Sequence, residues 1–299
     1  MESELLLEME EWVPRVGVVH LVPSYSALTS TPVSFRFELC ARVAGTWSAW
    51  VAADTIGSAL FDPLPATGAP LSADIDEFTT SAPADAIRLR MRGRGERAAL
   101  ASPWLITLSA SDRRSAPSTP VPSARGARLP VPAISQMVGG PNAMRICSPT
   151  SVAMVLGYWG RDVSALSLAA DVFHSGTDRY GVWPAAIAAA ARHDVAGYLL
   201  RFPDWAAAAW CLDHAMPIVA SVRFAAGELR GAPLAETSGH LIVLTGYEDD
   251  WVLVNDPAGV GDDGVRRRYQ RADLERVWLQ RAAIGYVFFP PPRAPVTGA

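Results

Sequence analysis

The first 110 or so residues of the chain alternate apolar and polar positions in short runs. A period of two is the pattern of strands that bury one face, and clusters of Gly, Pro, Asp and Ser separate the runs. The clearest runs are VSFRFELCARV, WSAWVAAD, AIRLRMRGRG and PWLITLSAS. The pattern predicts an all-β, sandwich-like domain over residues 1–112, whose role the sequence does not indicate.

The second half of the chain mixes two periods, because some segments repeat apolar residues at helical spacing and others carry them in continuous runs. Helices are predicted near residues 148–159, 164–173, 184–193, 204–214 and 271–279. Strands are predicted near residues 217–224, 240–247, 251–255, 265–270 and 283–289. This mixture predicts an α+β domain over residues 131–290.

Between the two halves runs a stretch rich in Pro, Ser and Arg that has no period, and it predicts a linker over residues 113–130. Residues 291–299, PPRAPVTGA, are predicted to be a loose tail. The boundary implies that the second half folds without the first, since about 170 residues are enough for an independent core.

Charge and composition exclude several classes of function. The net charge of −4 gives no reason to expect nucleic acid or an anionic membrane as a partner. All 26 basic residues are arginines, and we interpret the run RMRGRGER as a solvated strand end and turn rather than a binding patch. For Trp47 and Trp50 we favour core packing over a sugar-stacking platform.

The chain also shows no sign of export. Its start, MESELLLEMEEW, is acidic where a signal peptide is basic, and no segment reaches the roughly 18 apolar residues that span a bilayer. Three scattered cysteines do not make a disulfide framework. We therefore expect a cytoplasmic protein without membrane insertion, unless a different start codon adds an export signal, and the sequence leaves the oligomeric state open.

Candidate chemistry begins with the stretch RICSPTSVAMVLGYWG. Pro149 suits the first turn of a helix, and the apolar residues after it recur at helical spacing. Cys147 then lies at the N-terminus of a buried helix, where the helix dipole and free N–H groups favour a thiolate. A buried structural cysteine is the alternative, and the stretch alone leaves both open. Cys40 lies in an alternating strand, where core packing is expected.

A cysteine nucleophile needs a base, and the base needs an orienting group. Of the five histidines, His240 differs because it opens the buried run LIVLTGY, although a core histidine with its hydrogen bonds satisfied is the alternative. Asp256 follows 16 residues later, at the end of the next strand. In a hairpin it can bind one imidazole nitrogen and leave the other to Cys147, whereas Asn255 would point to the opposite face.

Gln136 lies 11 residues before Cys147, across a Gly-Gly-Pro-Asn loop. A side-chain amide beside the nucleophile is a suitable oxyanion donor, although a glutamine in a loop is more often simply solvated.

Residues 131–289 resemble the papain-like cysteine peptidases of the bacteriocin-leader-processing type, peptidase family C39, including its stand-alone bacterial relatives. The matching pieces are VPAISQMV, CSPTSVAMVLGYWG, GHLIVLTGY and VNDPAG, in the family's order. The resemblance implies a papain-like fold with Cys147 as nucleophile, His240 as base, Asp256 as orienting group and Gln136 in the oxyanion hole. It implies no metal and no cofactor. The first half is similar to a β-rich region that precedes this domain in some bacterial homologues.

The sequence departs from the exporter-fused members of that family. It holds no membrane spans and no GxxxxGK[ST] motif for nucleotide binding. An ordinary hydrolase that acts on a peptide or amide therefore fits better than leader cleavage coupled to export.

Three hypotheses remain. The favoured one is a thiol peptidase that works through a thioester on a peptide or protein substrate. The second is an acyltransferase or non-peptide amidase with the same nucleophile. The third is a catalytically silent binding protein in which the β-rich half does the work. The presence of all four candidate residues favours the first.

Overall fold

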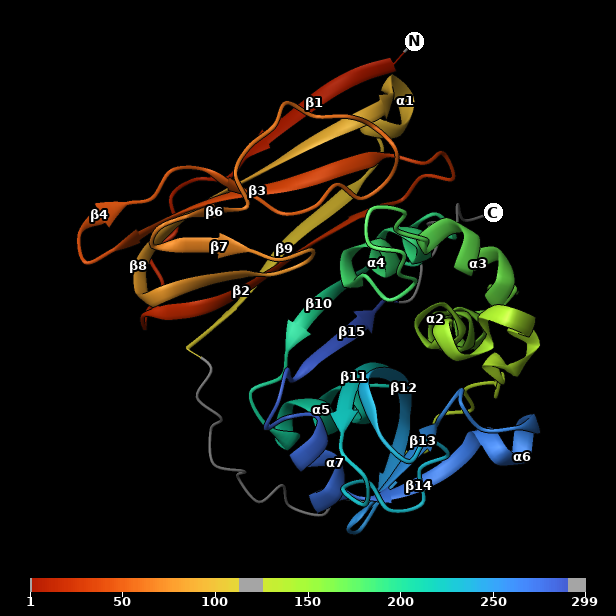
Figure 1. Ribbon diagram of the computed structural model, residues 1–299. Coiled ribbons are helices and arrows are strands. Elements are labelled where there is room, and N and C mark those ends of the chain that lie inside the picture. Colours follow the sequence, from red (N-terminus) through yellow and green to blue (C-terminus); the bar gives the residue numbers. More distant parts are fainter. Residues whose placement is uncertain (1, 113–125, 290–299) are drawn as a thin grey trace, which may run out of the picture.

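The computed structural model describes residues 2–112 and 126–289, and Figure 1 shows them as a β-rich half and a mixed half. The predicted linker residues 113–125 and the predicted tail lie outside the described residues. No helix in the described ranges has the length and apolar character that crossing a membrane requires.

The first half is built from antiparallel strands, with one short helix, α1 (Arg97–Leu100). Long β8 pairs with β1, β2, β3 and β7, so the strands join into one strongly bent sheet of order β4-β3-β8-β2-β9. The prediction of an all-β first half is confirmed. The strands are β1 (Glu2–Glu8), β2 (Val18–Ala27), β3 (Ser34–Val43), β4 (Thr46–Trp47), β5 (Val51–Ala52), β6 (Thr67–Gly68), β7 (Leu71–Ala73), β8 (Phe78–Glu96) and β9 (Trp104–Ser111).

The arginine run on β8 is integrated into the fold more fully than its sequence indicates. Glu38 on β3 is fully buried and forms ion pairs with arginines that include Arg90 and Arg92. The Arg90 guanidinium also lies 4.0 Å from the centre of the Trp50 ring, and Trp47 is stacked in the same way on a neighbouring arginine. Both tryptophans are only half-buried. They cover charged side chains on the sheet and are not core aromatics, which corrects the expectation.

The second half is a six-stranded sheet of order β10-β15-β11-β12-β13-β14 with helices on both faces. All ten predicted elements are present, and β10, α6 and a 3-10 segment are additional. The 3-10 segment is η1 (Gln136–Arg145), and the helices are α2 (Cys147–Tyr158), α3 (Ala165–Val172), α4 (Trp183–Ala191), α5 (Trp205–Asp213), α6 (Gly261–Val265) and α7 (Arg271–Val277). The strands are β10 (Gly197–Arg201), β11 (Ile218–Phe224), β12 (Thr237–Glu248), β13 (Trp251–Asn255), β14 (Arg266–Gln270) and β15 (Ile284–Phe288).

Strand alternation assigns the two faces of this sheet to two hydrophobic clusters. Val219, Leu241 and Val243 pack in the cluster that contains α2, α3 and α4. Their chain neighbours Ile218 and Ile242 pack with α5 and α7 on the opposite face. The α+β class predicted for this half is confirmed.

The end of the predicted linker lies along β12. The backbone N–H of Leu129 donates to the Thr245 carbonyl, and the N–H of Tyr247 donates to the Ala127 carbonyl. Residues 126–130 therefore pack as part of the second half.

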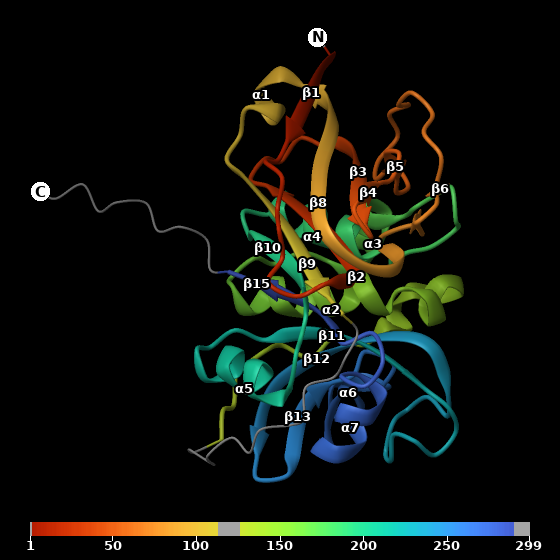
Figure 2. The same cartoon turned by 90° about the vertical axis from the view of Figure 1, so that its left-hand side faces the viewer.

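The two halves meet at β10, which is the edge strand of its sheet and lies beside β2 and β9 (Figure 2). Three backbone N–H groups of β10 donate to serine hydroxyls of those strands. The first half therefore covers an edge of the second sheet that would otherwise be open to solvent. The bonds run from Gly197 to Ser26 at 3.2 Å, from Leu199 to Ser24 at 3.1 Å and from Arg201 to Ser109 at 2.8 Å.

One hydrophobic cluster also runs across this junction, from Leu21 and Tyr25 on β2 to Ile187 on α4 and Leu199 on β10. Removal of the first half would expose this apolar surface and the edge of β10. The division at residues 113–130 into independently folding domains therefore stays a prediction, and the contacts make us expect a truncated second half to lose stability.

The serine contacts can be tested directly. Ser24→Ala together with Ser26→Ala should lower the free energy of unfolding by roughly 1–3 kcal/mol for each buried amide that loses its acceptor. Urea unfolding measures the change, and Ser58→Ala, at an exposed position, is the matched control. A double variant as stable as the control would show that the hydroxyls do not hold the halves together.

Candidate active site

Cys147 is the first residue of α2, as its sequence predicts, with Pro149 in the first turn. Its sulfur accepts hydrogen bonds from the backbone N–H groups of Ser148 and Leu241. It also forms a hydrogen bond with the side chain of His240. Burial raises the pKa of the Cys147 thiol, but these hydrogen bonds and the His240 charge outweigh burial and hold it below its usual value. The side chain is only partly buried, so a reagent can reach it.

α2 is attached to β12 at this point. The Ser151 hydroxyl donates to the Leu241 carbonyl at 3.0 Å, one turn along the helix from Cys147. This bond fixes the helix N-terminus against the strand that carries His240.

His240 is 2 % exposed and pairs with Val222 in the β11–β12 register. Its Nε2 lies 2.8 Å from Oδ1 of Asp256, which leaves Nδ1 for Cys147. Burial lowers the pKa of His240, but the hydrogen bonds and charges of Asp256 and Cys147 raise it well above its usual value. A lowered thiol pKa beside a raised imidazole pKa favours a thiolate–imidazolium pair.

Asp256 follows β13 directly and is fully buried. Besides His240, its carboxylate accepts the Ala258 backbone N–H at 3.0 Å and the Tyr269 hydroxyl at 2.7 Å. Burial raises the pKa of Asp256, and these three donors lower it below its usual value. The buried carboxylate is therefore ionised and has a donor on each oxygen.

The neighbouring Asn255 has a different set of partners, as strand alternation predicts. Its side-chain amide donates to the carbonyls of Val131 and Pro132 at 3.2 and 3.0 Å. It holds the entry segment of the second half in place and lies outside the Cys147–His240–Asp256 chain.

Gln136 opens η1 and is 1 % exposed, so it is not a solvated loop residue. Its backbone N–H donates to the Pro257 carbonyl at 2.8 Å, and the hydroxyl of the preceding residue, Ser135, donates to the Gly259 carbonyl. Its Oε1 is buried without a hydrogen-bond partner among the described residues. The structure thus brings Cys147, His240 and Asp256 into one hydrogen-bonded chain and places Gln136 beside the loop that follows Asp256.

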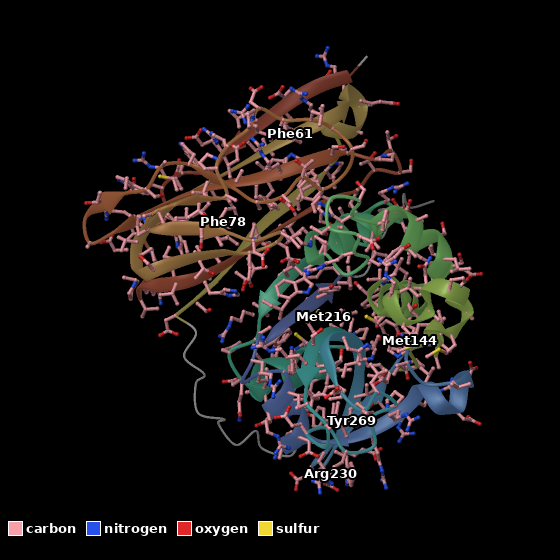
Figure 3. The ribbon with its side chains drawn as sticks, in the orientation of Figure 1. Phe61, Phe78, Met144, Met216, Arg230 and Tyr269 are labelled. Carbon is pink, nitrogen blue, oxygen red and sulfur yellow. The ribbon has the colours of Figure 1, made fainter. Side chains whose placement is uncertain are left out.

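Tyr269 is the member of this cluster that sequence reasoning missed. It is the one aromatic residue of the β14 sequence RRRYQ, it is fully buried, and it lies among the strands in Figure 3. The single aromatic residue in an arginine-rich strand was the available sequence signal, but the partner of its hydroxyl depends on the pairing of β13 with β14.

Cys147 lines a cleft of about 950 Å³ that both halves of the protein enclose. Met144 of the second half borders it and is labelled in Figure 3. The first half contributes His20 and a turn with three carboxylates, of which the Asp76 side chain accepts the Trp183 backbone N–H at 3.0 Å. Burial, together with the charges of neighbouring carboxylates, raises the pKa of Asp76 to about 7. The cleft is therefore polar and charged, and Cys147 forms part of its lining.

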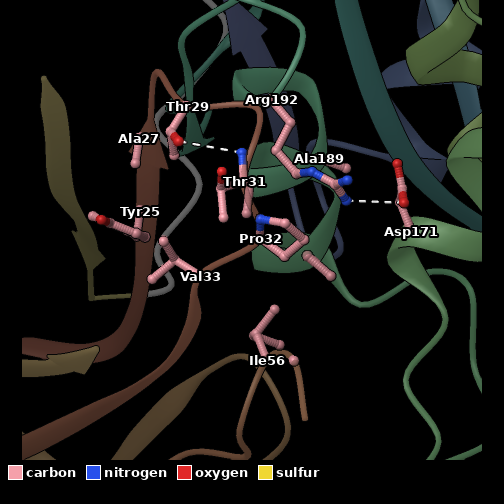
Figure 4. A pocket seen from close by; sticks show the side chains of 13 residues that line it. Tyr25, Ala27, Thr29, Thr31, Pro32, Val33, Ile56, Asp171, Ala189 and Arg192 are labelled. Atoms are coloured by element: carbon pink, nitrogen blue, oxygen red, sulfur yellow. Dashed lines mark hydrogen bonds and ion pairs between the residues drawn. The ribbon is translucent and has the colours of Figure 1, made fainter. Parts of the chain in front are cut away.

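A second cavity, of about 80 Å³, lies between β2 and α4 (Figure 4). It contains the ion pair of Arg192 with Asp171 at 2.9 Å, and no described residue that lines it is a cysteine or histidine. It therefore offers neither a thiol nor an imidazole.

Comparison with known proteins concerns the second half. A family model described as "Peptidase_C39 like family" matches residues 128–286, which is more than half of the chain. No curated protein matches the chain.

Three solved structures are similar to part of the chain. One is a C39-like peptidase from Bacillus anthracis, 19 % identical, with a TM-score of 0.43 over 56 % of this chain and 98 % of that one. Another is a double glycine motif protease from an AMS/PCAT transporter in complex with its leader peptide, 19 % identical, with a TM-score of 0.38 over 55 % and 94 %. The third is the peptidase domain of Streptococcus ComA, 15 % identical, with a TM-score of 0.37 over 54 % and 96 %.

The family match confirms the resemblance that the four sequence pieces indicated, and its residues coincide with the α+β half that carries Cys147, His240 and Asp256. The chain belongs to the peptidase C39-like family.

Proposed function

We propose that this protein is a cysteine peptidase that hydrolyses peptide bonds through the triad Cys147, His240 and Asp256 and a thioester acyl-enzyme. The observation that carries the proposal is the hydrogen-bonded chain from the thiol through the imidazole to a buried, ionised carboxylate. This is the arrangement that activates a cysteine nucleophile.

In the first step, the Cys147 thiolate attacks the carbonyl carbon of the scissile bond. The backbone N–H of Cys147 and the Gln136 side-chain amide bind the developing oxyanion. Nδ1 of the imidazolium of His240 gives its proton to the leaving nitrogen, the C–N bond breaks, and an amine departs from a thioester. Asp256 stabilises the imidazolium until that proton leaves.

In the second step, neutral His240 takes a proton from water, and the resulting hydroxide attacks the thioester carbon. The C–S bond breaks, the acid product leaves, and the thiolate–imidazolium pair is restored. Cys147, His240, Asp256 and Gln136 together supply the groups that both steps need.

The substrate is a peptide that lies in the cleft at Cys147, and the first half contributes one wall of that cleft. This placement supports a role for the β-rich half in substrate binding. The same thioester also serves an acyltransferase, in which an amine replaces water in the second step. Adding a candidate primary amine to the reaction and searching for the amide product by mass spectrometry separates the two activities.

Cysteine reactivity tests the nucleophile. Limiting iodoacetamide at neutral pH should alkylate Cys147 first, because its lowered pKa leaves the thiolate populated below the usual pH range of a thiol. Cys40 and Cys211 should react slowly, because burial raises the pKa of Cys40 and raises that of Cys211 to about 11. Peptide mass mapping gives the order of labelling. Preferential labelling of Cys40 or Cys211 would remove Cys147 as the nucleophile.

A further inference from the structure

The triad continues into a fourth buried residue. The Tyr269 hydroxyl donates to Oδ2 of Asp256 at 2.7 Å, while Oδ1 of the same carboxylate binds His240 and the Ala258 backbone N–H. Tyr269 and Asp256 are both fully buried, so bulk solvent does not reach this hydrogen bond.

The backbone brings these two residues together. Tyr269 lies opposite Val252 in the β13–β14 ladder, and the Asp256 backbone N–H donates to the Val265 carbonyl just before β14 begins. β14 is therefore attached to both ends of the segment that delivers Asp256, and the ring projects from a fixed strand rather than a loop.

The Tyr269 hydroxyl acts as a hydrogen-bond donor to Asp256 because it stays protonated. Burial, and then the Asp256 charge and hydrogen bond, raise the pKa of Tyr269 far above its usual value, so the hydroxyl keeps its proton. Its bond in turn helps to hold the pKa of Asp256 down. The other groups that act on this set are Cys147 from α2, His240 from β12 and, more weakly, Arg267 from β14.

We propose that Tyr269 is a positioning residue of the active site, which holds Asp256 ionised and oriented toward His240. The inference rests on the proposed function, because it gives Tyr269 its effect through the triad. Without the hydroxyl, Oδ2 becomes a buried acceptor with no donor, and the protonated carboxyl becomes easier to form. A protonated Asp256 cannot stabilise the imidazolium that keeps Cys147 as a thiolate.

The test is the pH dependence of Cys147 alkylation by iodoacetamide, which requires no knowledge of the substrate. The acid limb of this profile is the pH range in which the alkylation rate rises with pH. Tyr269→Phe should move it about one pH unit higher, since a hydrogen bond to a charged group corresponds to roughly that shift in pKa. At a pH on the wild-type acid limb the variant should therefore react about tenfold more slowly, with similar rates near pH 8.

Two controls separate positioning from packing. Tyr25→Phe removes another buried hydroxyl, from the first half, that has no partner among the described residues, and it should leave the limb unchanged. In an Asp256→Ala background, Tyr269→Phe should add no further shift, because the carboxylate through which it acts is gone.

The outcomes distinguish this inference from the proposed function. If Cys147 is the reactive thiol but the Tyr269→Phe limb coincides with that of wild type, Tyr269 is only a packing residue and the inference is wrong. If Cys147 of the wild type shows no enhanced reactivity, the proposed function itself fails. Should circular dichroism show Tyr269→Phe to be unfolded, 3-fluorotyrosine at position 269 keeps the ring and makes its hydroxyl a stronger hydrogen-bond donor. An acid limb below the wild-type position then supports the inference, and a limb at the wild-type position overturns it.

Discussion

Replacing Cys147 with alanine should reduce kcat/KM for peptide hydrolysis by roughly 10⁴-fold or more, because loss of a covalent nucleophile removes the acyl-enzyme route altogether. The side chain is partly buried and holds no structural bond beyond the site, so the variant should fold. Steady-state kinetics on a cleaved peptide measure the loss.

Cys211→Ala is the matched control for this change. Cys211 lies on α5, in the hydrophobic cluster on the sheet face opposite α2. Its replacement should leave kcat/KM close to the wild-type value. Full activity of Cys147→Ala, or equal losses in both variants, would contradict the assignment of the nucleophile.

The second large effect is expected at Asp256. Asp256→Ala should lower kcat by about 10³-fold or more, yet by less than loss of Cys147 or His240, because an orienting carboxylate contributes less than the nucleophile and base it serves. KM should change little. The same kinetic measurement, made on Cys147→Ala, His240→Ala and Asp256→Ala together, tests the ranking.

Asn255→Ala separates orientation from support. Its amide binds the carbonyls of Val131 and Pro132, so its loss should lower the free energy of unfolding by about 1–3 kcal/mol. The kcat of the folded variant should remain near the wild-type value. A greater loss of kcat in Asn255→Ala than in Asp256→Ala would show that the orienting group was assigned to the wrong residue.

The hydrogen-bonded chain of Cys147, His240 and Asp256 was open to prediction because each residue stands near the start or end of an apolar segment that the sequence marks clearly. Pro149 and the apolar run after it place Cys147 at a helix start, and a two-strand hairpin brings His240 and Asp256 together. The hairpin is a local relation that sequence spacing indicates, whereas the contact of Cys147 with His240 joins elements about 90 residues apart and depends on how α2 packs on β12.

Tyr269 and the junction were not predictable in that way. The contact of Tyr269 with Asp256 depends on how β14 pairs with β13. The sequence RRRYQ does not indicate which residue the tyrosine hydroxyl contacts. The serines at 24 and 26 look like the polar positions of an ordinary strand, yet they cap β10, a strand more than 170 residues further along the chain that the periodicity did not predict. The serine contacts join distant elements. Tyr269 is only 13 residues from Asp256, but the turn through α6, which the periodicity did not predict, sets which side chain of β14 reaches the carboxylate.

Profiling a diverse peptide library by mass spectrometry, with wild type and Cys147→Ala in parallel, tests the central claim most directly. We expect the wild type to produce new peptide termini at a consistent set of bonds and Cys147→Ala to produce none of them. The same cleavages by both proteins, or no cleavage by a wild type whose Cys147 reacts readily with iodoacetamide, would contradict the proposal that this protein is a Cys147-dependent peptidase.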